Sequence, residues 1–446
     1  MDRKKRVVLV FFLLVDLLFL VYCLNFRVNE TYDSIPAKYV ALSLLREGNP
    51  DLDEYAPFLR TTYLSDPHES SFGVLPYYLV EGTGPAGRHV LSNSGVGVAL
   101  LLVPAFYSMD RIKPLDARDI FLLAAAGRVV MSFFSALAAG FLYLILVRVP
   151  LSEGTRIVLP CAFALGTAMW TTASEGTWQH GPAVFLVVLM LYFLVLSGGK
   201  SRHFSYSAIP ASLALCLRPA LLPLVLCLFL YGALYRRKEL PLFVLLAMPA
   251  LALNGLYHYY YFGSPFIVSA QKSWASVALI KTGSPLIWQT GYFTGLWGNL
   301  FSPSRGLFVY SPFLLFALYS LFHRGGAFER PLVFFFAAGS LSLTFMPSMY
   351  FDWWGGVCYG NRYLLEGVPL LVLLIAHQSR RIMASPFLVA LFMVFLVFSI
   401  VVQYAGSALY DGLWDIMNHV DRDHGKLWDW HDSQLRFYLG RLFRGL

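Results

Sequence analysis

The chain contains few charged residues and few cysteines for its length. Only 13% of its 446 residues are Asp, Glu, Lys or Arg, whereas a soluble domain carries about 25%. So few charges cannot cover the surface of a water-soluble protein of this size. Five cysteines in 446 residues are too sparse for a disulfide scaffold. The composition therefore excludes a soluble domain, a disordered chain and a disulfide-rich secreted protein.

Several motifs of common enzyme classes are also absent. The sequence contains no Gly-x-x-x-x-Gly-Lys-Ser/Thr, no His-Glu-x-x-His, no Cys-x-x-Cys and no Gly-x-Ser-x-Gly, which are the motifs of P-loop ATPases, zinc proteases, thiol redox or zinc sites and serine hydrolases. ATP-driven transport, zinc proteolysis and serine hydrolysis therefore have no support in the sequence.

Long hydrophobic segments are abundant. Hydrophobic residues make up 57% of the chain, and the mean hydropathy is +0.60. Because a membrane-spanning helix needs roughly 20 apolar residues, this composition predicts an all-α polytopic membrane protein. The net charge of +8 then indicates topology, and no nucleic-acid partner is expected. The first apolar segment, 7–25, follows a basic stretch and precedes no small-residue cleavage site, so we expect an uncleaved anchor with a cytoplasmic N-terminus.

The distribution of basic residues predicts how the chain crosses the membrane. Residues 96–109 are apolar but would span only ~21 Å as a helix, so they suit a surface or re-entrant segment better than a crossing. Without them, eleven spans are predicted: 7–25, 120–147, 157–173, 182–198, 208–217, 221–235, 241–262, 307–322, 331–350, 363–376 and 386–405. The inner segments between these spans contain fifteen of the 34 lysines and arginines but only four acidic residues. Counting 96–109 as a span would move eleven of those fifteen outside, against the positive-inside rule.

This topology places the informative polar segments on the extracytoplasmic face. A long first outer loop covers residues 26–119 and contains surface helices. Residues 1–405 form the predicted transmembrane catalytic domain, and residues 406–446 form an amphipathic extracytoplasmic tail. The outer segments are rich in Trp, Tyr, Gly and acidic residues, a composition typical of a site at the boundary between membrane and water.

Asp33 is the candidate general base. It lies only a few residues after the first helix, where a phosphate carried on a lipid would arrive. A carboxylate held beside apolar surface is a stronger base than one in water. The alternative interpretation is a helix cap for residues 36–46, with Pro36 in the first turn.

A second acidic group follows in the same loop. Asp51, Asp53 and Glu54 form an Asp-x-Asp pattern whose oxygens suit a divalent cation. A solvated turn after the Gly48-Asn49-Pro50 stretch is the favoured interpretation.

The second outer turn, 174–181, places several recognition groups within a few residues. Trp178 can stack on a sugar face, while Glu175 and His180 can hydrogen-bond hydroxyl or phosphate groups. Interfacial anchoring by the indole is the alternative.

The candidate phosphate ligands are arginines, because guanidinium groups match phosphate oxygens. They are Arg218, before a proline, and Arg362, at the end of the segment 351–362. The rival roles are snorkelling for Arg218 and a structural ion pair with Asp352 or Glu366 for Arg362. Arg305, in the turn 299–306, is a further candidate anion contact.

Taken together, these motifs resemble the GT-C superfamily of integral membrane glycosyltransferases, which includes protein O-mannosyltransferases and the aminoarabinose transferase of lipid A. The chain is most similar to bacterial mannosyltransferase-like members. The resemblance covers residues 1–405 and rests on the order and spacing of a few motifs. These are Asp33-Ser34-Ile35-Pro36, Ser92-Asn93-Ser94-Gly95, Trp178-Gln179-His180-Gly181-Pro182, Phe301-Ser302-Pro303-Ser304-Arg305-Gly306, Trp353-Trp354-Gly355-Gly356 and Tyr359-Gly360-Asn361-Arg362-Tyr363.

The resemblance implies a GT-C-like bundle, a polyprenyl-phosphate-linked sugar as donor and inversion at the anomeric carbon. The family's first-loop acid is a general base, so that role falls on Asp33. Many relatives carry paired acids in this loop, whereas Asp33 has no acidic neighbour. Glu175 is the candidate for the second acid, and dependence on a divalent cation stays open.

The sequence therefore predicts a glycosyltransferase of a bacterial plasma membrane, with its active site and C-terminus outside the cytoplasm. Arg218 and Arg362 would stabilise the leaving phosphate, while Trp178, His180 and Tyr359 orient sugar or acceptor. The remaining candidate substrate-binding residues are Glu175, Arg305 and Asp352. The acceptor is a glycan, a lipid or a protein. Two alternatives stay open: a transporter or flippase of lipid-linked sugars, and a non-catalytic GT-C-like scaffold.

Overall fold

The computed structural model describes residues 2–63, 75–198, 203–266, 269–323 and 325–444. Residues 64–74 of the first outer loop, and residues 199–202 and 324 of two predicted inner loops, lie outside this range. The described chain is helical apart from one two-stranded sheet and an isolated bridge, which confirms the predicted fold class at this level.

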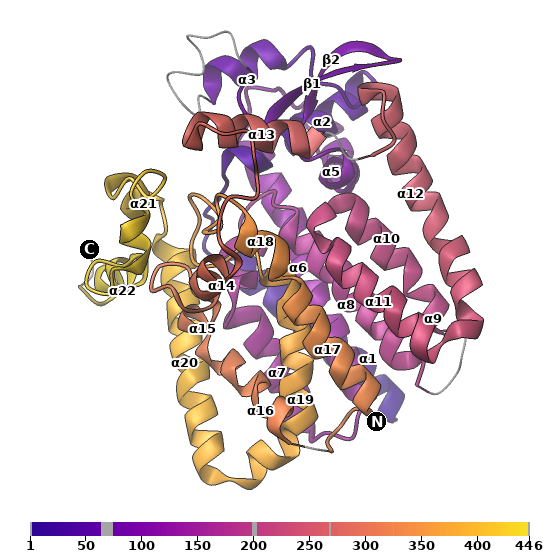
Figure 1. The fold of residues 1–446 in the computed structure, drawn as a ribbon, viewed down its shortest axis with the longest axis vertical. Coiled ribbons are helices and arrows are strands. Elements are labelled where there is room, and N and C mark those ends of the chain that lie inside the picture. The colour runs from indigo at the N-terminus through magenta and orange to yellow at the C-terminus, as the bar shows by residue number, and fades with distance from the viewer. Residues whose placement is uncertain (1, 64–74, 199–202, 267–268, 324, 445–446) are drawn as a thin grey trace.

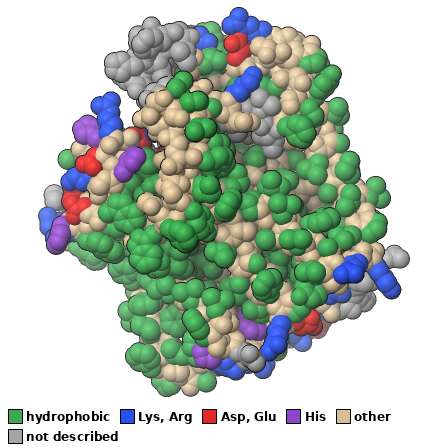
Figure 2. All heavy atoms as spheres, viewed as in Figure 1, with side chains coloured by type: hydrophobic (Ala, Val, Ile, Leu, Met, Phe, Trp, Pro, Cys, Tyr) green, Lys and Arg blue, Asp and Glu red, His purple; other side chains and the backbone are tan. Residues whose placement is uncertain are grey.

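Five described helices are long and apolar enough to cross a membrane. They are α1 (Arg3–Cys23), α6 (Ile120–Val147), the segment Arg237–Phe262 with α12 (Leu240–Phe262), the segment Arg330–Met349 with α17 (Arg330–Ser342) and α18 (Phe345–Met349), and α20 (Pro386–Leu409). Large apolar side chains are exposed along α1, α12 and α20, as at Leu17, Leu253 and Val394. Figure 2 shows apolar side chains over the middle of the molecule, and charged ones toward its upper and lower ends and over the tail at the left. These are features of a helical membrane protein.

Shorter apolar helices complete the bundle (Figure 1). They are α7 (Glu153–Leu165), α8 (His180–Leu196), α9 (His203–Tyr206), α10 (Ala208–Leu217), α11 (Leu222–Tyr235) and α19 (Val368–Ala384). Capping residues and first-turn prolines determine where several of these helices begin. The Ser152 hydroxyl accepts a hydrogen bond from the Thr155 amide at the start of α7, and prolines occupy the first turns of α11 and α19, where their missing N–H costs nothing.

Several predicted helical ranges differ from the helices of the structure, among them 331–350, which is divided between α17 and α18. The range 307–322 is divided into α15 (Leu307–Tyr310), a 3-10 turn (Pro312–Ala317) and α16 (Tyr319–Phe322); Pro312 follows the break and has no amide to continue the hydrogen-bond ladder. The range 157–173 is α-helical only to Leu165 and ends in a π-helical turn, Met169–Ala173. The range 363–376 starts five residues late, at Val368, after a 3-10 turn at Leu365–Gly367.

The described part of the predicted first outer loop, residues 26–119, is a folded unit. It contains the 3-10 turn η1 (Tyr32–Ser34), α2 (Pro36–Arg46), α3 (Ala56–Thr62), the antiparallel hairpin of β1 (Leu79–Gly84) and β2 (Gly87–Ser92), and α5 (Gly97–Asp110). The hairpin register pairs Leu79 with Ser92. α5 packs against α2 and α6, and α13 (Ser269–Thr282) packs on β1. Figure 1 shows this unit at one end of the bundle.

The tail from 406 does not begin at a structural boundary, because α20 continues to Leu409. Beyond it, α21 (Leu413–Met417), a 3-10 turn (His424–Trp428) and α22 (Gln434–Arg444) fold back on the bundle. Buried aromatic residues from the tail and from the segment before α19 form one cluster, which includes Trp353, Tyr359 and Trp414. The predicted amphipathic tail is therefore packed against the rest of the bundle.

Candidate functional site

The predicted site residues converge on one large cavity. Its volume is about 1050 Å³, which is in the upper range for small-molecule sites. The walls come from η1 after α1, the turn before α8, the end of α10 with the 3-10 turn that follows it, α13 and the segment 346–363. Six of the nine predicted residues line it: Asp33, Trp178, His180, Arg218, Asp352 and Arg362.

Asp33 and Arg362 form an ion pair, although they are 329 positions apart in the sequence. Nη2 of Arg362 lies 3.1 Å from Oδ2 of Asp33. The guanidinium also lies over two aromatic rings, 4.9 Å from the Trp178 centroid and 5.3 Å from that of Tyr363. Such stacking orients a guanidinium group. The rival role for Arg362 was an ion pair with Asp352 or Glu366; in the structure its ion pair is with Asp33, the candidate base.

The backbone around Arg362 requires glycine. Gly355 and Gly356 have φ angles of 84° and 67°, in the left-handed region that favours residues without a Cβ. A Cβ at Gly355 would lie 3.3 Å from Cγ and Nε of Arg362. The Gly355-Gly356 pair thus lets the chain turn tightly against the guanidinium side chain.

A second buried network holds Arg218. Its Nε lies 3.1 Å from Oε1 of Glu366, and the same oxygen lies 2.9 Å from Nδ1 of His180. Nη1 of Arg218 lies 3.3 Å from Nε2 of His180. Since the carboxylate only accepts and the guanidinium only donates, the imidazole carries its proton on Nδ1 and accepts at Nε2. Glu366 therefore fixes both side chains at the cavity wall.

Acidic and basic groups alternate on the side of the cavity facing α13. Nζ of Lys281 lies 3.0 Å from Oδ1 of Asp421 in the tail and 3.9 Å from Oδ2 of Asp352. Burial lowers the pKa of Lys281, but the two carboxylates outweigh it, so the pKa lies above its usual value. Burial raises the pKa of Asp352. These charges connect α13, the tail and the segment before α19 across one side of the cavity.

Three predicted site residues do not line the cavity. Glu175 is buried and accepts hydrogen bonds from Asn25 and Ser407. The Tyr359 hydroxyl donates to the carbonyl of Val402 at 2.9 Å. Both are part of the packing between the outer turns and α20.

Arg305 is also away from the cavity, and its side chain is fully buried. It forms an ion pair with Asp415 and donates to the carbonyl oxygens of Ser304, Trp354 and Gly356 at 2.7, 3.1 and 3.1 Å. Protein oxygens occupy the donors that an anion would need. Arg305 supports the glycine turn next to Arg362 rather than contacting the cavity.

Among the cavity residues that the sequence did not predict, two contact the predicted carboxylates Asp33 and Asp352. Tyr77 hydrogen-bonds through its side chain to Asp33, and burial together with that carboxylate raises the pKa of the phenol. Lys281 lies on α13, 71 positions before Asp352 and 140 positions before Asp421, the two acidic residues that it pairs with at the cavity. Neither residue belongs to a motif.

Glu366 was noted from the sequence only as a rival partner for Arg362. Its partner in the structure, Arg218, lies 148 positions away, and no local sequence pattern indicates such a pairing.

Comparisons of the chain with protein-family models, with curated proteins and with solved structures found no match. The chemistry must therefore be argued from the cavity. It combines a partly exposed carboxylate, two fixed guanidinium groups and an indole face at the ends of apolar helices. Such a set can bind a phosphate ester of a sugar and accept a proton close to it.

Proposed function

We propose that this protein is a glycosyltransferase of the GT-C type. It moves a sugar from a polyprenyl-phosphate donor to an acceptor hydroxyl, with inversion at the anomeric carbon. The observation that carries the proposal is the meeting of Asp33, Arg218 and Arg362 at one cavity beside apolar helices. A lipid-linked sugar phosphate offers the three features that such a site recognises: an anion, a polar ring and an apolar chain.

In the proposed reaction, Asp33 takes the proton of the acceptor hydroxyl as that oxygen attacks the anomeric carbon. The bond from this carbon to the phosphate oxygen breaks, and its electron pair leaves with the polyprenyl phosphate. Arg218 and Arg362 stabilise the charge that develops on the leaving group, which is commonly a large contribution to catalysis. Trp178, whose ring already lies against Arg362, supplies a stacking face for the sugar.

The proposal requires that the cavity open outside the cytoplasm. We propose eleven crossings, made by the five long helices and by the shorter apolar segments that pack among them, with the first outer loop and the tail outside. Arg88 in the hairpin and Arg380 at the end of α19 are exposed and lie on opposite sides in this topology. A membrane-impermeant thiol reagent added to intact cells should label Arg88→Cys and spare Arg380→Cys in a cysteine-free background. Labelling of Arg380→Cys alone would place the cavity on the cytoplasmic side and exclude the proposed compartment.

The function is tested with purified protein in liposomes that contain one labelled polyprenyl-phosphate sugar at a time, chosen from a panel of hexoses and pentoses. A transferase moves the label from the lipid phosphate to an acceptor and releases polyprenyl phosphate. A flippase moves the intact lipid between leaflets, and a scaffold does neither. Movement of intact lipid, or no turnover with any donor in the presence of glycan, lipid and peptide acceptors, would overturn the proposal.

A further inference from the structure

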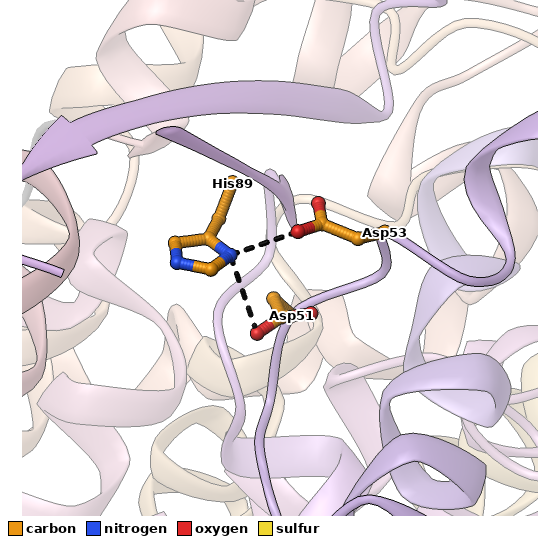
Figure 3. A group of neighbouring side chains, drawn as sticks. All are labelled: Asp51, Asp53 and His89. Atoms are coloured by element: carbon orange, nitrogen blue, oxygen red, sulfur yellow. Dashed lines mark hydrogen bonds and ion pairs between the residues drawn. The ribbon is translucent and has the colours of Figure 1, made fainter. Parts of the chain in front are cut away.

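A group of potential metal ligands lies in the first outer loop, outside the cavity. Asp51 and Asp53 precede α3, and His89 lies on β2 (Figure 3). Their nearest ligand atoms all lie within 4.8 Å of one another. Nδ1 of His89 is 2.8 Å from Oδ2 of Asp53 and 3.5 Å from Oδ2 of Asp51. The two contacts in Figure 3 thus converge on a single ring nitrogen.

The other nitrogen of His89 determines what Nδ1 can do. Nε2 lies 3.1 Å from the carbonyl oxygen of Ala86, and a carbonyl only accepts, so Nε2 carries a proton. In the neutral imidazole, the lone pair of Nδ1 then faces two carboxylates. Such a meeting of acceptors is unfavourable unless a proton or a metal ion lies between them. Histidines that bind metals commonly donate their second N–H to a backbone carbonyl in this way.

The charge of the group also lacks compensation. Among the described residues, no lysine or arginine forms a hydrogen bond or ion pair with Asp51 or Asp53. Asp51 is only 3% exposed; its contacts are the Asp53 backbone amide and His89, and burying a carboxylate without a counter-charge is costly. A proton on Nδ1 would satisfy Asp53 and leave one net negative charge. A divalent ion would neutralise both carboxylates.

Asp53 is held in place from its other side. Its Oδ1 accepts a hydrogen bond from the Val90 amide at 2.7 Å, which leaves Oδ2 directed toward His89. The side chains of Asp53 and His89 are 40% and 27% exposed, so water has access to the open side of the group. Three protein ligands and one water would complete a tetrahedral site.

The geometry points to a binding site for a divalent transition-metal ion of the Zn²⁺ class, with Asp51, Asp53 and His89 as its protein ligands. The imidazole ligand favours this class over Mg²⁺ and Ca²⁺, which prefer oxygen donors. The ion ties the turn before α3 to the hairpin. The hairpin in turn contacts α12, where the Ala86 amide donates to the carbonyl of Tyr260 at 2.9 Å. The bound ion therefore stabilises the first outer loop, independently of any transferase activity.

The test uses the full chain, purified in detergent with an affinity tag that contains no histidine. The protein is stripped with a chelator and dialysed against micromolar Zn²⁺, and the bound metal is measured by mass spectrometry together with the thermal unfolding temperature. The variants are Asp53→Asn and His89→Gln, because both side chains are partly exposed and their replacement does not leave a buried cavity. Glu81→Gln is the matched control, since Glu81 pairs with Arg88 on the same hairpin.

We expect the unaltered chain and the control Glu81→Gln to bind one more Zn²⁺ ion per chain than the two ligand variants, Asp53→Asn and His89→Gln. The affinity of the two variants should fall by about tenfold or more, because each loses one of three ligands. Zn²⁺ should raise the unfolding temperature of the unaltered chain and not that of the variants. Equal Zn²⁺ binding by all four proteins would assign the metal elsewhere, for example to the five cysteines, and would overturn the proposal. Ca²⁺ binding as tight as Zn²⁺ binding would overturn the assigned class of metal.

Discussion

The buried network around Glu366 makes a quantitative prediction. The Glu366 side chain is 2% exposed, and its Oε1 contacts both Nε of Arg218 and Nδ1 of His180 at 3.1 and 2.9 Å. Glu366→Gln keeps the shape of the side chain but removes its negative charge, so the Arg218 guanidinium and the His180 imidazole lose their carboxylate partner. Breaking a buried ion pair on one side costs about 3–5 kcal/mol, because the remaining charge is left unpaired. We expect a loss of that size in the free energy of unfolding.

A double-mutant cycle separates the pair from its surroundings. Arg218→Met should be destabilising for the same reason, since it leaves Glu366 with the imidazole as its sole neutral partner. The double variant removes both charges, so it should lose less than the two single losses combined, by about 2 kcal/mol or more.

Unfolding by SDS in mixed micelles, followed by intrinsic fluorescence, measures each free energy. Glu329→Gln is the control, because Glu329 is an exposed acid at the start of α17; its effect should stay within about 0.5 kcal/mol. Additivity of the two single losses to within about 0.5 kcal/mol would show that Glu366 and Arg218 are not coupled, and the proposed positioning of Arg218 would fail.

Three further predictions concern the surroundings of the cavity. Burial raises the pKa of Glu175 from 4.5 to about 8, so the folded state binds the proton more tightly and stability should fall as the pH rises between these values. Thermal unfolding measured across this pH range should show the fall for the unaltered chain and not for Glu175→Gln. An unchanged pH dependence in Glu175→Gln would contradict the prediction. Gly355→Ala should destabilise the protein by about 1–2 kcal/mol, because alanine is strained at the left-handed φ angle of this position. An unchanged thermal unfolding temperature would contradict this prediction. Lys281→Gln should cost under about 1 kcal/mol, because its pair with Asp421 is partly exposed, but should speed hydrogen exchange in the tail; unchanged exchange would show that Lys281 does not hold the tail.

The sequence predicted the helical membrane fold because long apolar segments and basic loops are local signals. The segments 120–147 and 386–405 lie within or coincide with α6 and α20. The range 307–322 was predicted as one helix and is interrupted at Ser311, because Pro312 has no amide to continue the ladder and the hydropathy pattern does not register that proline. The Ser311 hydroxyl donates to the carbonyl of Gly166 at 2.7 Å, and a hydropathy pattern contains no information on that contact.

The candidate site was predictable only in part, for a related reason. Residue type and position near a helix end selected Asp33, Arg218 and Arg362, and all three line the cavity. The same criteria selected Arg305, which is buried and forms an ion pair with Asp415 away from the cavity. Local sequence shows that an arginine lies near the membrane boundary, but its partner decides its role, and Asp415 lies 110 positions away.

The packing of the tail shows the same limitation. Residues 406–446 contain enough charge to suggest a separate end, yet Tyr438 and Trp414 are almost fully buried. Their burial depends on the aromatic residues before α19, which a single amphipathic pattern does not reveal. The tail also brings Asp421 to the cavity, so truncation after α20 would alter the site.

The central claim is that Asp33 is the base of a sugar transfer, and single-turnover kinetics with a donor identified from the panel tests it most directly. Binding of the donor is measured separately from transfer. Asp33→Asn keeps the shape of the side chain but cannot accept the acceptor's proton, so the account predicts donor binding within a few-fold of the unaltered protein and transfer slower by about 10²–10⁴-fold. Transfer by Asp33→Asn at the full rate would contradict the account, whatever the donor.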